Sequence, residues 1–461
     1  MNFRKFYKKK YGFKTKTKYE YLIKGEPSEK LVKEISKIKN EESFVTQFRL
    51  NGLKAFLSKP LPTWGPSLKE IDFNITYYAK PLTETVQSWE SLPKEIKKTY
   101  EKLKIPELER KYLGGLEAQF DSEIILKRVK EELKKQGIIF TDPDDGLKNY
   151  PIFKKWIGKV VPPNDNKFAA LNTAFFSGGS FIYVPPNTKV PYPLQTYFRI
   201  NAENVGQFER TLIIVDSGSE LTYIEGCTAP IYSKSSLHAA VVEIVAMPNS
   251  KVRYITLQNW SNNVYNLVTK RAFAYENARV EWIDANIGSK ITMKYPSVFL
   301  LGKNSSAEFL SIAYAGNGQI QDTGAKAIHV SEKTRSNIIA KSVSQNGGEA
   351  TYRGLIKITK NAINSKAFAK CNSLLLDEIS KANTYPYSYI ENELSLFTHE
   401  AFVGKIDEDK LFYLMSRGLE ENEALSLLVT GFFNDFIKQI PLEYSIEFQR
   451  LIELQIASGI C

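Results

Sequence analysis

The most reactive side chains belong to three cysteines, Cys227, Cys371 and Cys461, in a chain of 461 residues. A small odd number of cysteines, without a Cys-x-x-Cys pair, is not typical of a secreted disulfide-stabilised protein. A thiolate accepts sulfur by attacking a persulfide, and thiolates are the usual protein ligands of iron–sulfur clusters. His399 and Glu400 follow Cys371 in the sequence, and their side chains can replace thiolate where cysteine is scarce. Metal chemistry in this chain would therefore use few ligands.

Two of these cysteines lie in a part of the chain that repeats. A small or polar residue followed by alternating polar and apolar residues recurs, starting at Gly218, Asn249, Asn277, Asn304, Lys333 and Asn364. The spacing between successive starts is nearly constant. Such a period predicts the stacked coils of a parallel β-solenoid with apolar side chains inside, whereas a β-sandwich would not repeat so regularly. About one period separates Cys371 from His399 and Glu400, so we expect these groups at one site.

The chain divides into three predicted parts. Residues 1–137 are expected to form a helical region with loops, in which Ile125, Val129 and Leu133 predict a helix that Gly137 ends. Residues 138–400 form the predicted β-helix core domain. Residues 401–461 are expected to form a C-terminal helical domain. The apolar stripe of this domain includes Leu425, Leu428, Val429, Phe432, Phe433 and Phe436.

The overall charge is basic, with 62 Lys and Arg against 51 Asp and Glu and a formal net charge of +11. Such a balance suits nucleic acid, an anionic membrane surface or an acidic partner. The lysines are spread along the chain without a zinc-finger, RNP-like or KH-type motif, so we expect no nucleic-acid binding. No apolar run is long enough to span a bilayer, and residues 1–24 do not read as a secretory signal.

A family resemblance is carried by eight short stretches: residues 197–201, 225–230, 237–243, 258–260, 268–272, 352–358, 398–401 and 411–418. In their order and spacing they resemble the SufB branch of the SufB/SufD family, which serves iron–sulfur cluster assembly in the SUF system. Each stretch alone is a weak signal, whereas the ordered set is specific. The resemblance begins near Glu29 and is dense beyond Phe140.

This resemblance implies a right-handed parallel β-helix flanked by helical domains, and a scaffold that is not itself an enzyme. Such a scaffold accepts persulfide sulfur from the cysteine desulfurase SufS with SufE. It builds a transient iron–sulfur cluster at the interface with SufD, or with a second SufB copy, and passes the cluster to apoproteins. The SufC ATPase would dock on residues 401–461 and drive the cycle. The chain itself has no Gly-x-x-x-x-Gly-Lys-Ser/Thr loop, so it would not bind ATP in that way. Some family members also use a reduced flavin.

The resemblance assigns sulfur acceptance to Cys227 and Cys371, and it makes Cys371, His399 and Glu400 the expected metal ligands. It also implies a sulfur path inside the solenoid, lined by Arg199, Asn201, Gln258, Trp260 and Lys270. Polar side chains inside a solenoid are unfavourable unless they are paired or hydrated, so a row of them indicates a lined passage. Nearby cations, for which Arg199 and Lys270 are the candidates, would favour the Cys227 thiolate.

Simpler interpretations compete with these assignments. An isolated Cys227 would be interpreted as a small buried hydrophobe. Many family members carry a glutamate where this chain has Thr398, which weakens the case for a second carboxylate ligand. His238 and His329 are interpreted as structural, and Cys461 as exposed and incidental.

Other functions remain alternatives at this point. A polysaccharide-processing β-helix needs clustered carboxylates, whereas Asp284, Asp322 and Asp377 are scattered through the repeat. A SufD-type partner would supply ligands without accepting sulfur, and the retention of both inner cysteines favours SufB. A basic nucleic-acid-binding scaffold is the third alternative. The AT-biased residue usage predicts a plastid stroma as the compartment, with a bacterial cytoplasm second.

Overall fold

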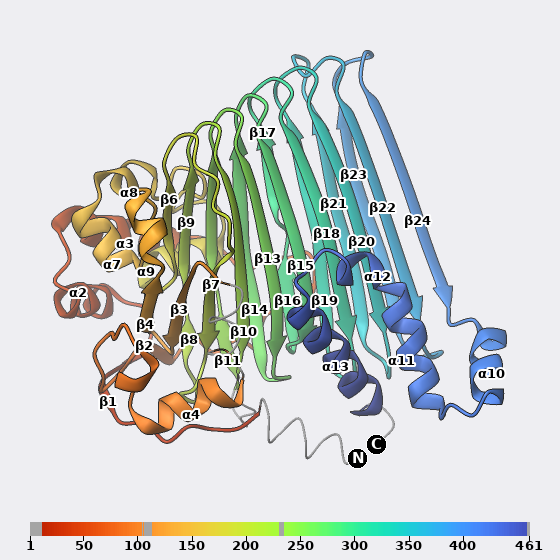
Figure 1. The fold of residues 1–461 in the computed structure, drawn as a ribbon, viewed down its shortest axis with the longest axis horizontal. Coiled ribbons are helices and arrows are strands. Elements are labelled where there is room, and N and C mark those ends of the chain that lie inside the picture. The colour runs from red at the N-terminus through yellow and green to blue at the C-terminus, as the bar shows by residue number, and fades with distance from the viewer. Residues whose placement is uncertain (1–11, 104, 106–112, 230–234, 459–461) are drawn as a thin grey trace.

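The computed structural model describes residues 12–103, 105, 113–229 and 235–458, and most of this chain winds into a long β-solenoid (Figure 1). One sheet has ten strands, in the spatial order β24 (Leu396–Lys405), β22 (Lys366–Leu375), β20 (Arg335–Ser344), β18 (Ser306–Ala315), β15 (Arg279–Gly288), β13 (Lys251–Trp260), β10 (Glu220–Thr228), β7 (Leu194–Arg199), β3 (Gly115–Phe120) and β4 (Glu123–Val129). Its strands from β3 to β24 pair in parallel.

The second sheet has twelve strands and forms the other wall of the solenoid. Its main path is β23 (Lys381–Ile390), β21 (Glu349–Ile358), β19 (Ile320–His329), β16 (Ile291–Lys294), β14 (Val264–Ala274), β12 (Val241–Ala246), β9 (Arg210–Val215), β6 (Phe181–Val184) and β5 (Ile139–Thr141). Beside this path lie β8 (Gly206–Gln207), β11 (Ser236–His238) and β17 (Ser297–Leu300). The predicted mainly β architecture with a parallel solenoid is confirmed.

The sequence repeat marks one corner of each coil. All six predicted starts have a positive φ, between 56° and 73°: Gly218, Asn249, Asn277, Asn304, Lys333 and Asn364. Glycine and asparagine enter this left-handed region most easily, which explains five of the six residue types. The asparagine amides also stack from coil to coil, since Asn277 Nδ2 donates to Asn249 Oδ1 at 3.0 Å. Aromatic side chains form a similar column inside the solenoid, where Tyr254 packs between Tyr223 and Trp282.

The N-terminal part combines helices with strands. Its helical elements are α2 (Glu29–Ile38), α3 (Ser43–Ser58), the 3-10 helix η1 (Trp89–Ser91), α4 (Lys94–Lys102) and α6 (Glu131–Lys135). A separate antiparallel pair consists of β1 (Tyr19–Gly25) and β2 (Ile75–Pro81). The helix predicted through Ile125, Val129 and Leu133 is wrong, because the first two residues lie in β4 and the third in α6. Consecutive residues of β4 are buried because the strand is covered on both faces. The spacing of four between the apolar residues suggested a helix instead.

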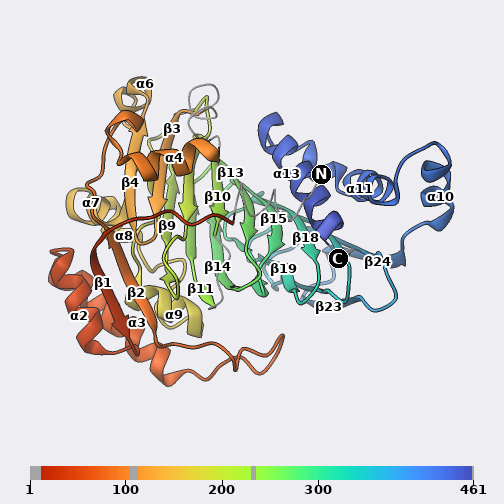
Figure 2. The same cartoon turned by 90° about the horizontal axis from the view of Figure 1, so that it is seen from below.

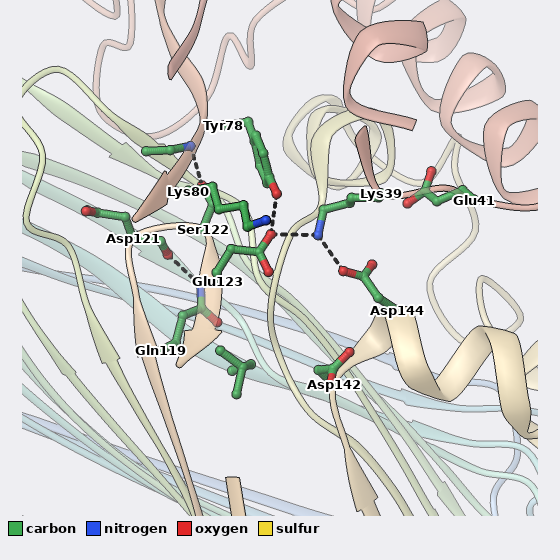
Figure 3. Close-up of polar contacts among 12 residues, drawn as sticks. Lys39, Glu41, Tyr78, Lys80, Gln119, Asp121, Ser122, Glu123, Asp142 and Asp144 are labelled. Carbon is green, nitrogen blue, oxygen red and sulfur yellow. Dashed lines mark hydrogen bonds and ion pairs between the residues drawn. The ribbon is translucent and has the colours of Figure 1, made fainter. Parts of the chain in front are cut away.

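A buried charge cluster fixes the N-terminal helices to the solenoid (Figure 3). Lys39, after the end of α2, places its Nζ 2.9 Å from Glu123 Oε1 and 2.6 Å from Asp144 Oδ2. Tyr78 donates a hydrogen bond to the same Glu123 oxygen at 2.6 Å. Asp144 belongs to α7 (Pro143–Asn149), which α8 (Pro151–Trp156) and α9 (Lys167–Phe175) follow. The cluster therefore joins α2, β2, β4 and α7 around one ammonium group.

Four helices follow the last coil: α10 (Glu408–Ser416), α11 (Glu421–Phe432), α12 (Asn434–Ile437) and α13 (Leu442–Ser458). α11, α12 and α13 lie along the outer side of the ten-stranded sheet, whereas α10 projects beyond its terminal strand β24 (Figures 1 and 2). From the predicted apolar stripe, Val429, Phe433 and Phe436 are buried in one cluster with Ile283 and Ile312 of the sheet. No helix within the described ranges is long and apolar enough to cross a membrane.

Candidate functional site

Cys371 and His399 meet at the last coil of the solenoid. Strands β22 and β24 pair so that Cys371 lies beside Ala401 and Ala369 lies beside His399. Side chains two positions apart share a face of a sheet, so the imidazole points toward the thiol. Cys371 Sγ is 3.8 Å from His399 Nε2 and 3.8 Å from Thr384 Oγ1 of β23. Burial raises the pKa of Cys371, although the contact with Thr384 acts in the opposite direction.

Glu400 points to the other face of β24. It lies beside Lys370 in the register, and the two side chains form an ion pair at 2.9 Å. Its side chain is 52% exposed. The structure thus brings His399 to Cys371 and does not bring Glu400 there. Among the residues that the structure describes, no three His, Cys, Asp or Glu side chains come together in a way that could hold a metal ion.

The pair lies at an open end of the solenoid. β24 is the terminal strand of its sheet and β23 is the terminal strand of the other sheet. Large apolar side chains are exposed around this end: Ile379, Tyr385, Tyr387, Tyr389, Ile390, Leu394, Leu396, Phe402 and Val403. Terminal strands that expose apolar side chains are strong candidates for an interface with another chain.

Cys227 lies on β10, inside the solenoid and five strands away from β22. The register places it between Phe198 of β7 and Gln258 of β13. Its side chain is 1% exposed, and Sγ contacts Glu225 Oε1 at 3.6 Å. Burial raises the pKa of Cys227 well above its ordinary value, and Glu225 raises it further, while Lys270 acts to lower it. Of the two cations predicted near this thiol, Lys270 therefore acts on it.

A buried charge triad continues from Cys227 along the interior. Lys270 Nζ and Lys294 Nζ each lie 3.1 Å from Asp284 Oδ1, and all three side chains are at most 2% exposed. Burial alone would raise the pKa of Asp284, but the two ammonium groups lower it to about 2. Burial lowers the pKa of Lys294 to about 8. This triad places positive charge inside the solenoid, where a sulfur anion could be stabilised.

Further polar and charged groups extend this network to the opposite wall. Gln258 Oε1 accepts hydrogen bonds from Lys294 Nζ at 3.2 Å and from Asn266 Nδ2 at 2.9 Å. Asn266 Oδ1 lies 2.7 Å from His238 Nδ1, and His238 Nε2 lies 2.8 Å from Glu209. The ring of Trp260 packs on His238, with centroids 4.7 Å apart. Gln258, Trp260 and Lys270 thus belong to one interior network, which also includes His238.

Arg199 and Asn201 have a different position. Arg199 donates to Thr228 Oγ1 at 3.0 Å and to the carbonyl oxygen of Phe13 at 2.7 Å. Asn201 exchanges hydrogen bonds with the backbone of Thr15 at 2.9 and 3.0 Å. Phe198, the neighbour of Arg199, shares a face with Cys227, so Arg199 points away from that thiol. These two side chains hold residues 13–15 against the solenoid.

One register column connects the neighbourhood of Cys227 to Cys371. From coil to coil, the residues in this column are Glu225, Thr256, Asp284, Ser311, Ala340 and Cys371. A second column from the other sheet contains Lys294, Thr323, Tyr352 and Thr384. The two columns face each other, because Lys294 contacts Asp284 and Thr384 contacts Cys371. Five steps between neighbouring strands separate β10 from β22, or about 24 Å at the usual strand spacing.

Sequence reasoning missed Glu225, Asp284, Lys294 and Thr384 as parts of the site. The signal for the first column was present, since each of its members lies seven positions after a repeat start. The partners of His329 agree with a structural role, because its two ring nitrogens lie 2.8 Å from Thr334 Oγ1 and Ser336 Oγ. Cys461 lies outside the described residues.

The fold and the site together define a β-solenoid with thiol and charged groups along its interior and a thiol–imidazole pair at its open end. A family model described as "SUF system FeS cluster assembly, SufBD core domain" matches residues 198–432. A second model, "SufBD protein N-terminal region", matches residues 93–196. The chain belongs to the SufBD family of iron–sulfur cluster assembly proteins.

Curated relatives support this placement. The chain is 51% identical over 453 residues to an iron–sulfur cluster assembly SufBD family protein of Staphylococcus aureus strain MRSA252, covering 98% of this chain and 97% of the relative. The same identity and coverage are found for a SufBD family protein of Staphylococcus epidermidis. These relatives are bacterial, and they give the predicted plastid location no support.

Proposed function

We propose that this protein is a SufB-type scaffold on which an iron–sulfur cluster is built. The observation that carries the proposal is the single register column that leads from Glu225, beside Cys227, to Cys371 at the open end. Cys227 accepts sulfur from a persulfide donor such as the SufS–SufE pair. Cys371 and His399 then hold the growing cluster, which is the cargo of the scaffold and passes to apoproteins. The retention of both thiols favours SufB over SufD.

The distance between the two thiols determines how sulfur crosses. At about 24 Å, Cys371 cannot attack a persulfide on Cys227 directly. Sulfur would therefore cross as a small anion such as hydrosulfide, and its release from a persulfide requires two electrons and hence a reductant. The ammonium groups of Lys270 and Lys294, close to Cys227, favour such an anion in the interior.

The open end supplies a surface where further ligands could join the cluster. A thiolate and an imidazole leave coordination positions of iron unfilled. The exposed edges of β23 and β24 would pair with SufD or with a second copy of this chain, which would complete the ligand set. Glu400 remains a proposed ligand that would have to leave its ion pair with Lys370. Since the relatives are bacterial, we place this assembly in a bacterial cytoplasm.

Anaerobic reconstitution with iron tests the two thiol roles separately. With inorganic sulfide as the sulfur source, Cys371→Ser is expected to lose the cluster, whereas Cys227→Ser should assemble it. When the protein is first loaded with a persulfide donor, freed of unreacted donor and only then given iron and a reductant, both variants should fail, because the sulfur then has to enter through Cys227. Absorbance and Mössbauer spectra report the cluster, and Cys461→Ser provides a thiol-to-hydroxyl control that should behave as wild type. Normal cluster formation by Cys371→Ser would overturn the proposal.

The C-terminal helices carry the proposed contact with the SufC ATPase. α10 has no buried residue, and it exposes Phe412, Tyr413 and Met415 by 73%, 55% and 42%. An uncovered aromatic group on a helix marks a protein-binding surface more often than a folding requirement. α11, which follows α10, and α13 are packed on the solenoid. A force that the ATPase exerts on α10 would therefore be transmitted to the last coil.

A Phe412→Glu variant is expected to lose SufC capture in a pull-down assay. The substitution puts a charge in the centre of the exposed aromatic group, and a central contact in such an interface typically contributes about 2 kcal/mol or more. Leu57→Glu, which changes a 62% exposed apolar residue on α3, is the matched control. SufC capture by Phe412→Glu at the wild-type level would exclude α10 as the docking element.

A further inference from the structure

Sulfur acceptance at Cys227 requires a thiolate, and the surroundings of this thiol oppose one. Burial raises the pKa of Cys227 well above its ordinary value, and the carboxylates of Glu225 and Glu209 raise it further. Lys270 and Lys294 act in the opposite direction, but the net shift remains upward. The thiol is therefore protonated at neutral pH. Because the thiolate is the nucleophile in sulfur transfer, a base must take the proton at the moment of reaction.

Glu225 is placed to act on this proton. It precedes Cys227 by two positions on β10, so both side chains point into the solenoid. Sγ lies within hydrogen-bonding distance of Glu225 Oε1, at 3.6 Å. The other carboxylate oxygen accepts a hydrogen bond from the hydroxyl of Tyr254. The carboxylate is only 4% exposed, so one oxygen is held by the phenol while the other faces the thiol.

Among the described residues, the other charged groups that act on this thiol make no hydrogen bond with its sulfur. Glu209 forms an ion pair with His238 at 2.8 Å. Lys270 and Lys294 both bind Asp284, and an ammonium group has no lone pair to take a proton. Within the described part of the chain, Glu225 therefore supplies the carboxylate oxygen that contacts Sγ.

We propose that Glu225 is the general base that activates Cys227 for sulfur acceptance, an inference that rests on the sulfur-accepting role proposed above for that thiol. The carboxylate takes the Sγ proton, and the thiolate attacks the outer sulfur of a donor persulfide. A sulfur–sulfur bond forms at Cys227 while the sulfur–sulfur bond of the donor breaks. The donor leaves as a thiolate and then takes the proton from Glu225. Neither step changes the overall oxidation state, and the carboxylate is restored.

A Glu225→Gln variant tests this inference, because an amide keeps the side-chain length but cannot hold the proton. The background is Cys371→Ser with Cys461→Ser, so that Cys227 is the single thiol. Inorganic polysulfide is the donor, and peptide mass spectrometry follows the gain of one sulfur atom at Cys227. General-base catalysis typically contributes about 10²- to 10⁴-fold, so the rate should fall by that order. Glu220→Gln, a change on the exposed part of the same strand, should leave the rate unchanged.

Two further measurements separate a base from a merely structural group. Glu225→Asp retains a carboxylate and should recover part of the lost rate. In Glu225→Gln, hydroxide must remove the proton, so the rate should rise about tenfold per pH unit below the thiol pKa. The remaining groups that interact electrostatically with this thiol are common to both proteins: Glu209, Lys270 and Lys294, with the phenols of Tyr197 and Tyr254. The comparison therefore isolates position 225.

The outcomes distinguish the inference from the function on which it rests. Sulfur uptake by Glu225→Gln at the wild-type rate would overturn the role of Glu225 and leave Cys227 as the acceptor. Equal losses in Glu225→Gln and Glu225→Asp would also overturn it, since a base should be rescued by the shorter carboxylate. If Cys227 gains no sulfur in the protein with Glu225 intact, the proposed acceptor role fails and the inference fails with it.

Discussion

An Ala340→Leu variant is expected to load sulfur on Cys227 and to lose its delivery to Cys371. Ala340 lies directly between Ser311 and Cys371 in the register column of the ten-stranded sheet. It is the one member of this column without a polar side chain, and its methyl group leaves the most room. Leucine would place three more carbon atoms in the solenoid interior at this position, where they would close the column. Overpacking of this kind costs about 1–3 kcal/mol, which a solenoid of this size can tolerate.

The measurement compares two sulfur sources on the same variant. After Ala340→Leu has been loaded with a persulfide donor and freed of unreacted donor, mass spectrometry should still find the extra sulfur on Cys227, whereas cluster formation should be lost when iron and a reductant are then added. With inorganic sulfide, which reaches the open end from solvent, cluster formation should be retained. Ala307→Leu is the matched control, because it enlarges a 1% exposed alanine in a different register column of the same sheet, between Val280 and Ser336. Unimpaired delivery in Ala340→Leu would show that sulfur does not follow this column.

The solenoid could be predicted because its physical cause is local. Each coil needs one residue in the left-handed region, and the asparagines and glycine that accept this conformation recur at the predicted starts. Counting seven positions from each start also gives the whole column from Glu225 to Cys371. The register column between the thiols was thus encoded in the repeat, whereas the facing column, with Lys294 and Thr384, depends on how the second sheet closes over the first.

The face that a side chain occupies was harder to predict than the coil on which it lies. The last step of the sheet places Ala401 beside Cys371, one position beyond Glu400 and two beyond His399. An expected offset of about one period does not decide between His399 and Glu400, because a change of one position in register exchanges the two faces. The orientation of Arg199 could have been predicted from strand alternation. Its neighbour Phe198 shares a face with Cys227, so Arg199 must point to the other face.

The strand β4 in the N-terminal part was not predicted, for a different reason. The spacing of Ile125, Val129 and Leu133 satisfies a helix, but the pairing of β4 with β3 determines the observed strand. That pairing joins residues to a sheet whose other strands come from far along the chain. A local pattern cannot reveal such a partner, and tertiary packing overrides a weak helical preference.

An Asp284→Asn variant is expected to lower the free energy of unfolding by about 3–5 kcal/mol, the usual effect of removing one partner from a buried ion pair. Asparagine keeps the size of the side chain but leaves Lys270 and Lys294 without their shared carboxylate. Urea unfolding at neutral pH should show a lower midpoint with an unchanged slope. Asp435→Asn, which removes a 56% exposed carboxylate from its pair with Lys341, is the control. It should cost less than about 1 kcal/mol.

The pH dependence of this loss tests its electrostatic cause. In the folded protein the pKa of Lys294 is already lowered to about 8, and removing Asp284 should lower it further. A folded lysine with a depressed pKa binds fewer protons than the unfolded chain, so its contribution to stability rises with pH. The deficit of Asp284→Asn should therefore narrow as the pH rises from 6 to 8, and it should level off above pH 8, where Lys294 is neutral in both folded proteins. A deficit that stays constant over this range would show that packing around Asp284, and not the charge of the two lysines, determines the loss.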